Sequence, residues 1–286
     1  MKKFGIIGPG AVGTAIAFAL RENALDVTLL GRENSEVRFQ DYNEQAIHTL
    51  PVESLKSSTE TFDILFIAVK TTQLDQITPH LTNITHDKTV IILTQNGYGQ
   101  LKQINHSHVY QAVVYISGQK TDQQVTHFRD WTLKLPINND TLLLKSLTKD
   151  SILNIECIED YYEQVWYKLL VNLGINTVTA ITRQTAKVLK SDGIENLCRN
   201  LLIEGRRIAS AEGIHFNEQL IDSIMNIYAG YPDDMGTSMY YDVINHKSLE
   251  NEYIQGYLLE QSKKHQLSTP LIENCYAILN TFQPEV

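Results

Sequence analysis

The chain has 286 residues, of which 43% are hydrophobic and 20% charged, so it can bury a core in one or two domains without disulfide support. Its formal net charge of -9 argues against nucleic acid and anionic membranes as partners. No apolar run approaches the roughly 18 residues of a membrane helix, and the N-terminal run, interrupted at Gly8, is too short for a signal peptide. We therefore expect a cytoplasmic protein with no nucleic-acid or membrane partner.

The three cysteines, Cys157, Cys198 and Cys275, are far apart in the chain and odd in number. No pair of them has the spacing of a metal-binding or redox motif. Reduced thiols in a cytoplasmic compartment are therefore expected, and no metal site is predicted.

Short apolar segments alternate with helical patterns in the first half of the chain. The segments that read as buried strands are residues 3–7, 26–32, 62–70, 89–99 and 109–118. Helical periodicity follows the first of them, in residues 8–23, and the third, in residues 72–81. Strands that alternate with helices in this way indicate a doubly wound parallel sheet.

The pattern changes after residue 150, where long helices dominate. They are predicted from residue 159 onward and in residues 193–213, 216–231 and 268–282, with Pro270 in the first turn of the last one. No low-complexity linker separates the two halves of the chain. We place the boundary within residues 155–162, which gives an N-terminal α/β domain, 1–158, and a C-terminal helical domain, 159–286.

The sequence GPGAVG follows the first strand and opens the first helix. Gly8 permits the tight turn, Gly10 lets the backbone approach a pyrophosphate, and Gly13 lets the helix pack closely on the strand. The helix N-terminus then offers backbone N–H groups and a favourable dipole to phosphate. A glycine turn without a ligand is the alternative, but the position between strand and helix predicts a dinucleotide site. Its predicted cofactor-binding residues are Gly8, Pro9, Gly10, Ala11, Val12 and Gly13.

The end of the second strand distinguishes NAD from NADP. Sites for NAD place an acidic side chain there, which binds the ribose 2′-hydroxyl. Here the strand ends in TLLGRE and offers Arg32 instead. Because a guanidinium pairs well with a 2′-phosphate, we predict NADP(H) as the cofactor. Glu33 follows directly and leaves NAD open if the register is shifted by one residue.

More polar residues follow the carboxyl ends of later strands, which border the ligand crevice in parallel sheets. Lys70 comes after ILFIAV, and Gln73 lies nearby; both are predicted cofactor contacts, although a lysine at a strand end is also an ordinary feature. Asn96 closes the next strand in TQNG. Asn-Gly is a common turn, but its predicted place beside the nicotinamide makes Asn96 a candidate for binding both cofactor and substrate.

Residues 165–180, VWYKLLVNLGINTVTA, form a mostly apolar helical pattern. Lys168, Asn172 and Asn176 occur in it at steps of four and therefore share one face. A solvated face of an amphipathic helix is the ordinary explanation, but exposed faces favour Glu, Lys and Arg, and asparagine is a poor helix former. Because a buried ammonium or amide needs partners, we predict that this face lines the cleft between the domains and binds a polar substrate.

Partners for Lys168 are expected in residues 236–260. Glu250 is the candidate acid, although acidic residues are also favoured in the first turn of a helix. Ser238 is a candidate substrate contact, although it is also placed to cap a helix that starts at Met239.

Several short motifs occur in one order along the chain. They are Gly8–Gly13, Ala68-Val69-Lys70, Gln95-Asn96-Gly97, Lys168–Asn172 with Asn176, Thr237-Ser238-Met239 with Asp242, and Glu250 with Tyr253-Ile254-x-Gly256. In order and spacing they resemble the ketopantoate reductases (2-dehydropantoate 2-reductases), over nearly the whole chain. The lysine–asparagine helix and the motifs after it are more specific than the glycine loop. Residues 118–136 follow the family pattern only loosely, and we assign no role to His127.

The resemblance implies an N-terminal Rossmann-type doubly wound sheet and a C-terminal all-α domain like that of 6-phosphogluconate dehydrogenase. It implies NADPH-dependent reduction of 2-ketopantoate to (R)-pantoate, a step towards pantothenate and coenzyme A. By this resemblance Lys168 is the general acid for the ketone oxygen, Glu250 interacts with that lysine and the substrate, and Arg32 and Lys70 lie at the cofactor phosphates. The residues that it implies for the substrate's hydroxyl and carboxylate are Asn96, Asn172, Asn176 and Ser238.

Two other readings of function remain open. The same site also suits another branched 2-keto acid, or a 3-hydroxy acid, because similar sites in the superfamily act on other substrates. Alternatively, the chain is a non-catalytic NADP(H)-binding, redox-sensing regulator, since dinucleotide-binding domains are reused in that way. A sensor has no need of the proton donor predicted at Lys168, which argues against the regulator. Helix-rich second domains of this superfamily often pair, so we expect a homodimer.

Overall fold

A computed structural model describes residues 2–282 of the chain. The strands are β1 (Lys3–Ile7), β2 (Asp26–Gly31), β3 (Ser35–Asp41), β4 (His48–Ser54), β5 (Ile64–Ile67), β6 (Val90–Leu93), β7 (Val109–Gln111), β8 (Val113–Thr121), β9 (Gln124–Pro136) and β10 (Asn154–Ile158). The α-helices are α1 (Ala11–Glu22), α2 (Leu74–Ile84), α3 (Asn139–Leu147), α4 (Tyr161–Thr182), α5 (Ile194–Ala211), α6 (Leu220–Ala229), α7 (Ser238–Ile244), α8 (Gln255–Lys264) and α9 (Pro270–Asn280). Short 3-10 helices are η1 (Thr71–Gln73), η2 (Gln100–Gln103), η3 (Ala186–Lys190) and η4 (Asn251–Tyr253).

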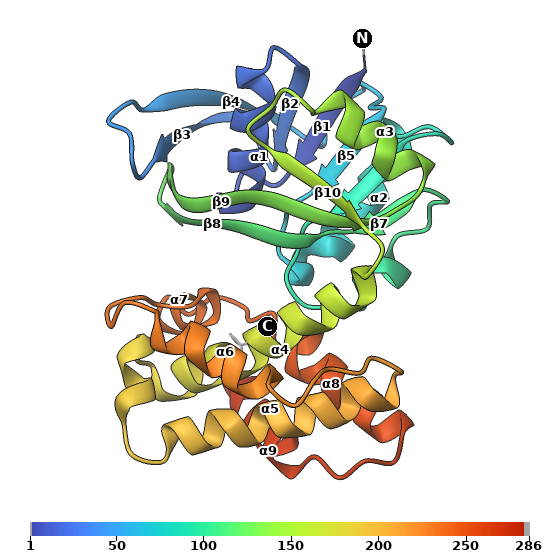
Figure 1. The fold of residues 1–286 in the computed structure, drawn as a ribbon. Helices are drawn as coiled ribbons and strands as arrows, with labels where there is room; N and C mark the ends of the chain where they lie inside the picture. The colour runs from blue at the N-terminus through green and yellow to red at the C-terminus, as the bar shows by residue number, and fades with distance from the viewer. Residues whose placement is uncertain (1, 283–286) are drawn as a thin grey trace. The chain divides into compact units, whose positions relative to one another are not determined.

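The described residues form two compact units. Residues 2–95 and 100–161 make up one, here called the sheet unit, and residues 96–99 and 162–282 make up the other, the helical unit. Figure 1 shows the strands in the N-terminal half of the chain and the long helices in the C-terminal half, which confirms the predicted fold class. The short segment 96–99 packs with the helical unit although its neighbours in sequence belong to the sheet unit.

The strands of the described chain form one sheet in the order β10-β9-β3-β4-β2-β1-β5-β6-β7, with β8 paired to β9. Strands β2, β1, β5, β6 and β7 are parallel, as the strand–helix alternation predicts. Two antiparallel pairs were not predicted: β3 with β4, and β8 with β9. The β8–β9 hairpin contains most of residues 118–136, for which sequence reasoning gave no structure.

Both faces of the central sheet are covered, because successive side chains of a strand point to opposite faces. Phe4 and Ile6 of β1 pack in one buried cluster with Ile16 of α1. Ile7, the next residue, packs in another cluster with Leu74 of α2. Figure 1 shows α1 and α2 in the sheet unit, and the two clusters place them on opposite faces of the sheet. Each fully buried side chain of this size contributes about 1.5–3 kcal/mol to folding.

Two strands end earlier than their apolar sequences suggest. Strand β5 ends at Ile67 rather than at Lys70, and β6 ends at Leu93. The side chains of Thr94 and Gln95 both donate to the Ile67 carbonyl, at 3.0 Å each, so they close the edge of the sheet in place of further strand pairing. The residues after each strand are thereby released into the loops where ligands bind in such sheets.

Helix α4 is enclosed by the other helices of its unit. A Cβ added to Gly205 of α5 would lie 2.4 Å from a methyl carbon of Leu170, so α5 packs directly on α4. From α6, the buried Tyr228 donates its hydroxyl to the Val171 carbonyl at 2.7 Å. Pro270 occupies the first turn of α9, as predicted. A helix packed this tightly is expected to be apolar on every covered face, which makes its polar residues informative.

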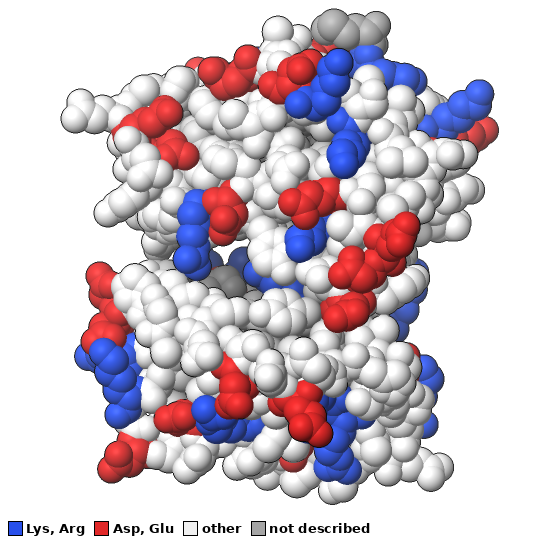
Figure 2. Space-filling model, in the orientation of Figure 1, with Lys and Arg blue, Asp and Glu red and all other residues white. Residues whose placement is uncertain are grey.

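The surface carries both signs of charge. On the face that Figure 2 shows, acidic and basic side chains are interspersed over both units. Within residues 2–282, every helix is too short or too polar to cross a membrane.

Candidate functional site

The glycine loop connects β1 to α1 in a conformation that excludes larger residues. Gly8 has a φ of +111°, and a Cβ there would lie 2.7 Å from the Val69 nitrogen. A Cβ on Gly13 would lie 2.1 Å from the Gly8 carbonyl oxygen. The turn is therefore as tight as the motif predicts, with α1 packed on the end of β1.

The start of α1 has the features of a phosphate site. Gly10 is its N-cap and has no side chain that could satisfy the first N–H groups of the helix. A Cβ built on Gly10 meets nothing within 4 Å, so it would fill the space above the loop that a pyrophosphate needs. Backbone N–H groups and open space at a helix N-terminus suit the pyrophosphate of a dinucleotide.

Arg32 comes directly after β2, at the carboxyl end of the sheet. Its neighbour Gly31 pairs with Ser54 of β4, and a Cβ on Gly31 would lie 2.7 Å from a methyl carbon of Val52. The Arg32 side chain is exposed, with Nη2 3.4 Å from Oε1 of Gln76 on α2. A guanidinium in this place is available to a ligand that binds along the end of β2.

Lys70 and Gln73 lie at the ends of η1, between β5 and α2. Lys70 is the N-cap of η1, and the Gln73 N–H donates to its carbonyl at 2.9 Å. Both side chains are half-buried. The parallel pairing of β5 with β1 places this turn next to the glycine loop, because the ends of adjacent strands are neighbours.

The loop that carries Asn96 is held by the segment after Glu250. The Tyr98 N–H donates to the Tyr253 carbonyl at 2.8 Å. Gly97 has a φ of +79°, and a Cβ there would lie 2.2 Å from the same carbonyl oxygen. The Tyr98 ring packs edge-on against Tyr257, with centroids 5.4 Å apart, and burial raises the pKa of Tyr98 to about 12. Asn96 is thus positioned as part of the helical unit.

The polar face of α4 is not a solvated stripe. Lys168 and Asn172 are half-buried, and Asn176 is only 5% exposed. The side-chain nitrogen Nδ2 of Asn172 is buried and has no hydrogen-bond partner among residues 2–282. A buried amide without a partner destabilises the fold by about 1–3 kcal/mol. A ligand that accepts a hydrogen bond from this nitrogen would remove that cost.

Helix α7 is tied to the same face of α4. Thr179, three residues beyond Asn176, has its hydroxyl 2.8 Å from that of Thr237. Thr237, and not Ser238, is the N-cap of α7, since its hydroxyl accepts from the Tyr240 N–H at 3.1 Å. The capping alternative for Ser238 is therefore wrong, because the helix begins one residue earlier than expected. Ser238 is the exposed first residue of α7.

Helix α8 reaches α4 through one buried side chain. Gln255, fully buried at its N-terminus, donates from Nε2 to the Thr177 hydroxyl at 2.8 Å and lies 3.9 Å from the Met239 sulfur. Glu250, half-buried, precedes this helix at the N-cap of η4. Three positions that sequence reasoning missed, Thr177, Thr179 and Gln255, thus join α4, α7 and α8. Only Thr179 had a sequence signal, because a residue three positions beyond Asn176 lies on the same side of the helix.

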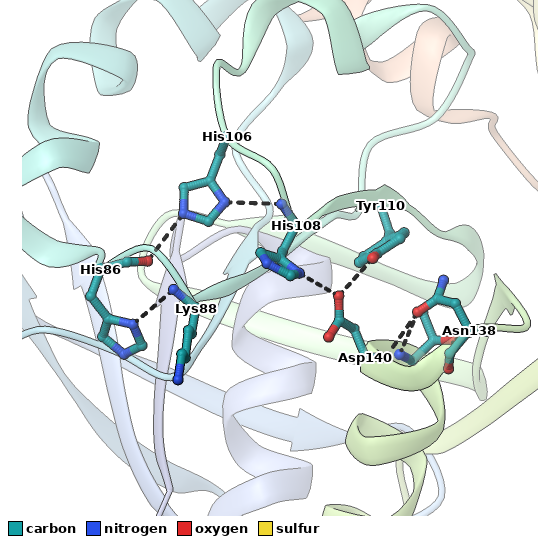
Figure 3. Close-up of polar contacts among 8 residues, drawn as sticks. His86, Lys88, His106, His108, Tyr110, Asn138 and Asp140 are labelled. Carbon is teal, nitrogen blue, oxygen red and sulfur yellow. Dashed lines mark hydrogen bonds and ion pairs between the residues drawn. The ribbon is translucent and has the colours of Figure 1, made fainter.

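A second polar cluster lies in the sheet unit and contains none of the predicted site residues. Figure 3 shows Asp140, near the start of α3, accepting a hydrogen bond from the Tyr110 hydroxyl, with His108 Nδ1 at the same oxygen; both distances are 2.6 Å. Burial alone would raise the pKa of Asp140, but these two bonds more than offset it, so the pKa is lowered. Within the described chain, no group of three or more His, Cys, Asp and Glu side chains is arranged to hold a metal ion.

Comparison with known proteins identifies the family. The model described as ketopantoate reductase PanE/ApbA matches residues 4–138, and the one described as its C terminal domain matches residues 160–283. A 2-dehydropantoate 2-reductase of Mycobacterium tuberculosis is 30% identical over 275 residues, which cover 93% of this chain and 92% of that protein. The chain belongs to the ketopantoate reductase family. The resemblance predicted from the motifs is confirmed.

Solved structures agree with this family. A dimeric ketopantoate reductase from Staphylococcus aureus has a TM-score of 0.95 and 46% identity, with 98% of each chain covered. D-mandelate dehydrogenase, solved with NADH and anilino(oxo)acetate, has a TM-score of 0.87 at 19% identity, with 98% of this chain and 97% of that one covered, and shares the fold. Family membership makes the chain an oxidoreductase that acts on a small molecule with a nicotinamide dinucleotide.

Proposed function

We propose that the protein reduces 2-ketopantoate to (R)-pantoate with NADPH, a step towards pantothenate and coenzyme A. The observation that carries the proposal is the α4 face in a chain of this family: a lysine and two asparagines in a helical unit, with the Asn172 Nδ2 buried and without a partner. A substrate that accepts a hydrogen bond from this amide removes the cost of burying it.

The sheet unit would hold the cofactor. The loop Gly8–Gly13 fits the pyrophosphate, and the exposed Arg32 suits the 2′-phosphate of NADPH. Lys70 and Gln73 follow the neighbouring strand and add polar groups at the same edge. When bound, the reduced nicotinamide supplies the hydride for the keto carbon. Arg32→Ala is expected to weaken NADPH binding at least tenfold more than NADH binding, because only NADPH carries the 2′-phosphate. Equal losses for both cofactors in a binding titration would remove Arg32 from this role.

The helical unit would provide the proton. As the carbonyl is reduced, its electron pair moves to the oxygen, and the Lys168 ammonium donates a hydrogen bond and then a proton to that oxygen. The product is an alcohol, and the neutral amine regains its proton from solvent. Glu250 is proposed to interact with this lysine and with the bound substrate.

The remaining polar groups would orient the substrate. Asn96, Asn172, Asn176 and Ser238 are proposed to bind its carboxylate and hydroxyl. Orientation of this kind accounts for a large part of the rate enhancement of enzymes. The cross-links from Thr179 to Thr237 and from Gln255 to Thr177 support this role, since they hold α7 and α8 against α4.

The direct test is NADPH oxidation, followed by absorbance, with ketopantoate as substrate. Parallel assays use NADH and a panel of other branched 2-keto acids. Fast turnover of ketopantoate, selective for NADPH, is the expected result. A higher kcat/KM for another 2-keto acid would replace the substrate. Tight NADPH binding with no turnover of any acid would support the redox-sensing regulator instead.

We extend the proposal to a homodimer. The S. aureus relative with 46% identity is described as dimeric. Light scattering on the purified protein should give twice the chain mass of 32.5 kDa. A mass that stays at one chain across the concentrations used in the assay would refute the dimer and leave the chemistry untouched.

A further inference from the structure

Lys120 of β8 makes a long-range contact with the glycine loop. Its ammonium donates to the carbonyl oxygen of Pro9 at 2.7 Å, across 111 residues of sequence. The side chain is half-buried, and it comes from the part of the chain where neither pattern nor resemblance predicted a role. A lysine anchored on the phosphate-binding loop therefore needs an explanation.

The β8–β9 hairpin is shaped to bring β8 against the start of α1. The pairing of the two strands is irregular between Ile116 and Gly118, as in a β-bulge, which redirects the following side chains. A Cβ on Gly118 would lie 2.8 Å from the Thr126 carbonyl oxygen and 3.6 Å from the Ala11 Cβ. Figure 1 shows the hairpin as the longest strand pair of the sheet unit, and α1 packs against both of its strands. The close packing of β8 on the start of α1 thus places Lys120 beside the glycine loop.

The positive charge of Lys120 lies at the glycine loop, where the anionic pyrophosphate is expected to bind. Pro9 has no N–H to offer a phosphate, and its carbonyl oxygen is a partial negative charge within the loop. An ammonium bonded to this oxygen offsets that charge and adds a full positive charge beside the helix N-terminus. It also ties the loop to the hairpin, so that the loop N–H groups keep their orientation before the cofactor arrives.

We propose that Lys120 is a cofactor-positioning residue, which fixes the Pro9 carbonyl and stabilises the pyrophosphate of the bound dinucleotide. This inference rests on the proposed function, since it takes the Gly8–Gly13 loop to be the pyrophosphate site. The pyrophosphate is common to NADH and NADPH, whereas the 2′-phosphate is not. Lys120 should therefore affect both cofactors equally, in contrast to Arg32.

The experiment measures the affinity of the full-length protein for NADPH and for NADH by titration calorimetry at two salt concentrations. Lys120→Met removes charge and donors, Lys120→Gln keeps a donor for the Pro9 carbonyl, and Lys120→Arg keeps the charge. Lys134→Met is the matched control, because Lys134 lies at the opposite end of the same hairpin, 5.3 Å from the Tyr115 ring centroid. Thermal unfolding without ligand is recorded for every variant, so that a variant that fails to fold is recognised.

Lys120→Met is expected to lose affinity for NADPH and for NADH by the same factor, roughly tenfold, the size of one charge-assisted hydrogen bond. Lys120→Gln, which keeps a donor but not the charge, should lose less. Binding by both variants should depend less on salt than binding by the wild type, while Lys120→Arg and Lys134→Met stay close to the wild type. Wild-type affinity in a folded Lys120→Met variant, or a loss confined to NADPH, would overturn the inference. A wild-type protein that binds neither dinucleotide would overturn the proposed function together with the inference, whereas a loss confined to the variants concerns Lys120 alone.

Discussion

At the scale of single residues, the side-chain amide of Asn172 distinguishes a binding face from a structural one. Natural proteins satisfy nearly all buried polar groups, and an exception is explained by strain, by function or by a bound water or ion. Other buried side-chain atoms within residues 2–282, such as Gln95 Oε1 and Gln255 Oε1, also have no hydrogen-bond partner, but Asn172 lies on the polar face of α4. The residues on either side of Asn172 in the sequence, Val171 and Leu173, are buried in the core of the helical unit, whereas the residues one turn away on its own face are Lys168 and Asn176. Asparagine at this position therefore points to a requirement other than stability.

Asn172→Leu tests this requirement, because leucine has a similar size and no unsatisfied N–H. The free energy of unfolding without ligand is expected to stay constant or rise by about 1 kcal/mol, since a buried group without a partner is removed. The KM for ketopantoate is expected to rise at least tenfold. Urea unfolding and the NADPH-oxidation assay provide the two values, with Asn226→Leu on the exposed surface of α6 as the control. A clear loss of stability together with an unchanged KM would assign Asn172 to the fold.

At the scale of elements, three helices are joined at one place by short polar side chains. Thr179 donates its hydroxyl proton to the Ile175 carbonyl at 2.7 Å, so Thr237 must donate in the bond between the two threonines. Thr237 also caps α7 and precedes Ser238. A series of hydrogen bonds with defined donors and acceptors therefore connects α4 to the start of α7, next to Ser238. A single substitution can break it.

Thr179→Val keeps the shape of the side chain and removes the acceptor of the Thr237 hydroxyl. The free energy of unfolding is expected to fall by about 1–2 kcal/mol, and the KM for ketopantoate to rise, because Ser238 loses its support. The affinity for NADPH should not change. Thr182→Val is the matched control, since among residues 2–282 the Thr182 hydroxyl bonds only to the Val178 carbonyl of its own helix. A KM that changes as little as in the control would show that this bond does not position Ser238.

The hydrogen bond between Tyr110 of β7 and Asp140 of α3 predicts how the stability of the fold depends on pH. The folded pKa of Asp140 lies below its ordinary value of 3.8, so its carboxylate stabilises the fold above about pH 4 and less as the pH falls further. Burial and the bond to Asp140 raise the pKa of Tyr110 from 10.0 to about 12, so this phenol stabilises the fold below pH 10 and ceases to do so as the pH rises towards 12.

Asp140→Asn should therefore destabilise the protein most at neutral pH. The difference in free energy of unfolding from the wild type is expected to shrink below pH 4, where the wild-type carboxyl becomes protonated. Urea unfolding from pH 3 to pH 8 measures it, with Asp234→Asn at an exposed position as the comparison. A difference that does not vary with pH would mean that the Asp140 charge contributes nothing.

At the scale of the whole molecule, the features that could be predicted from the sequence are those in which local geometry dictates the residue type. Gly8 and Gly13 were predictable because a positive φ and a contact of 2.1 Å admit glycine alone. The common helix of Lys168, Asn172 and Asn176 followed from their spacing, and the central strands followed from unbroken apolar runs. The family itself followed from motifs spread over both halves of the chain.

The rest depends on contacts between distant residues. Strands β3 and β4 have two buried residues each, which alternate with exposed ones. Neither strand therefore has an apolar run from which it could be predicted. Thr177 meets Gln255 across 78 residues, and Lys120 meets Pro9 across 111, and nothing in the local sequence of either partner predicts the other. The N-cap of α7 was misplaced by one residue because Thr237 and Ser238 are both capping residues and serine is the more favoured of the two.

The most direct test of the proposed mechanism is the turnover number of Lys168→Ala with ketopantoate, measured together with its affinity for NADPH. Because the proton is proposed to come from the helical unit and the cofactor to bind the sheet unit, kcat is expected to fall about 100- to 10,000-fold while NADPH binding is unchanged. Lys190→Ala, at an exposed lysine of the same unit that pairs with Asp233, should retain full activity. Near-normal turnover in the Lys168→Ala variant would contradict the proposed mechanism, because Lys168 would then have no part in the chemistry.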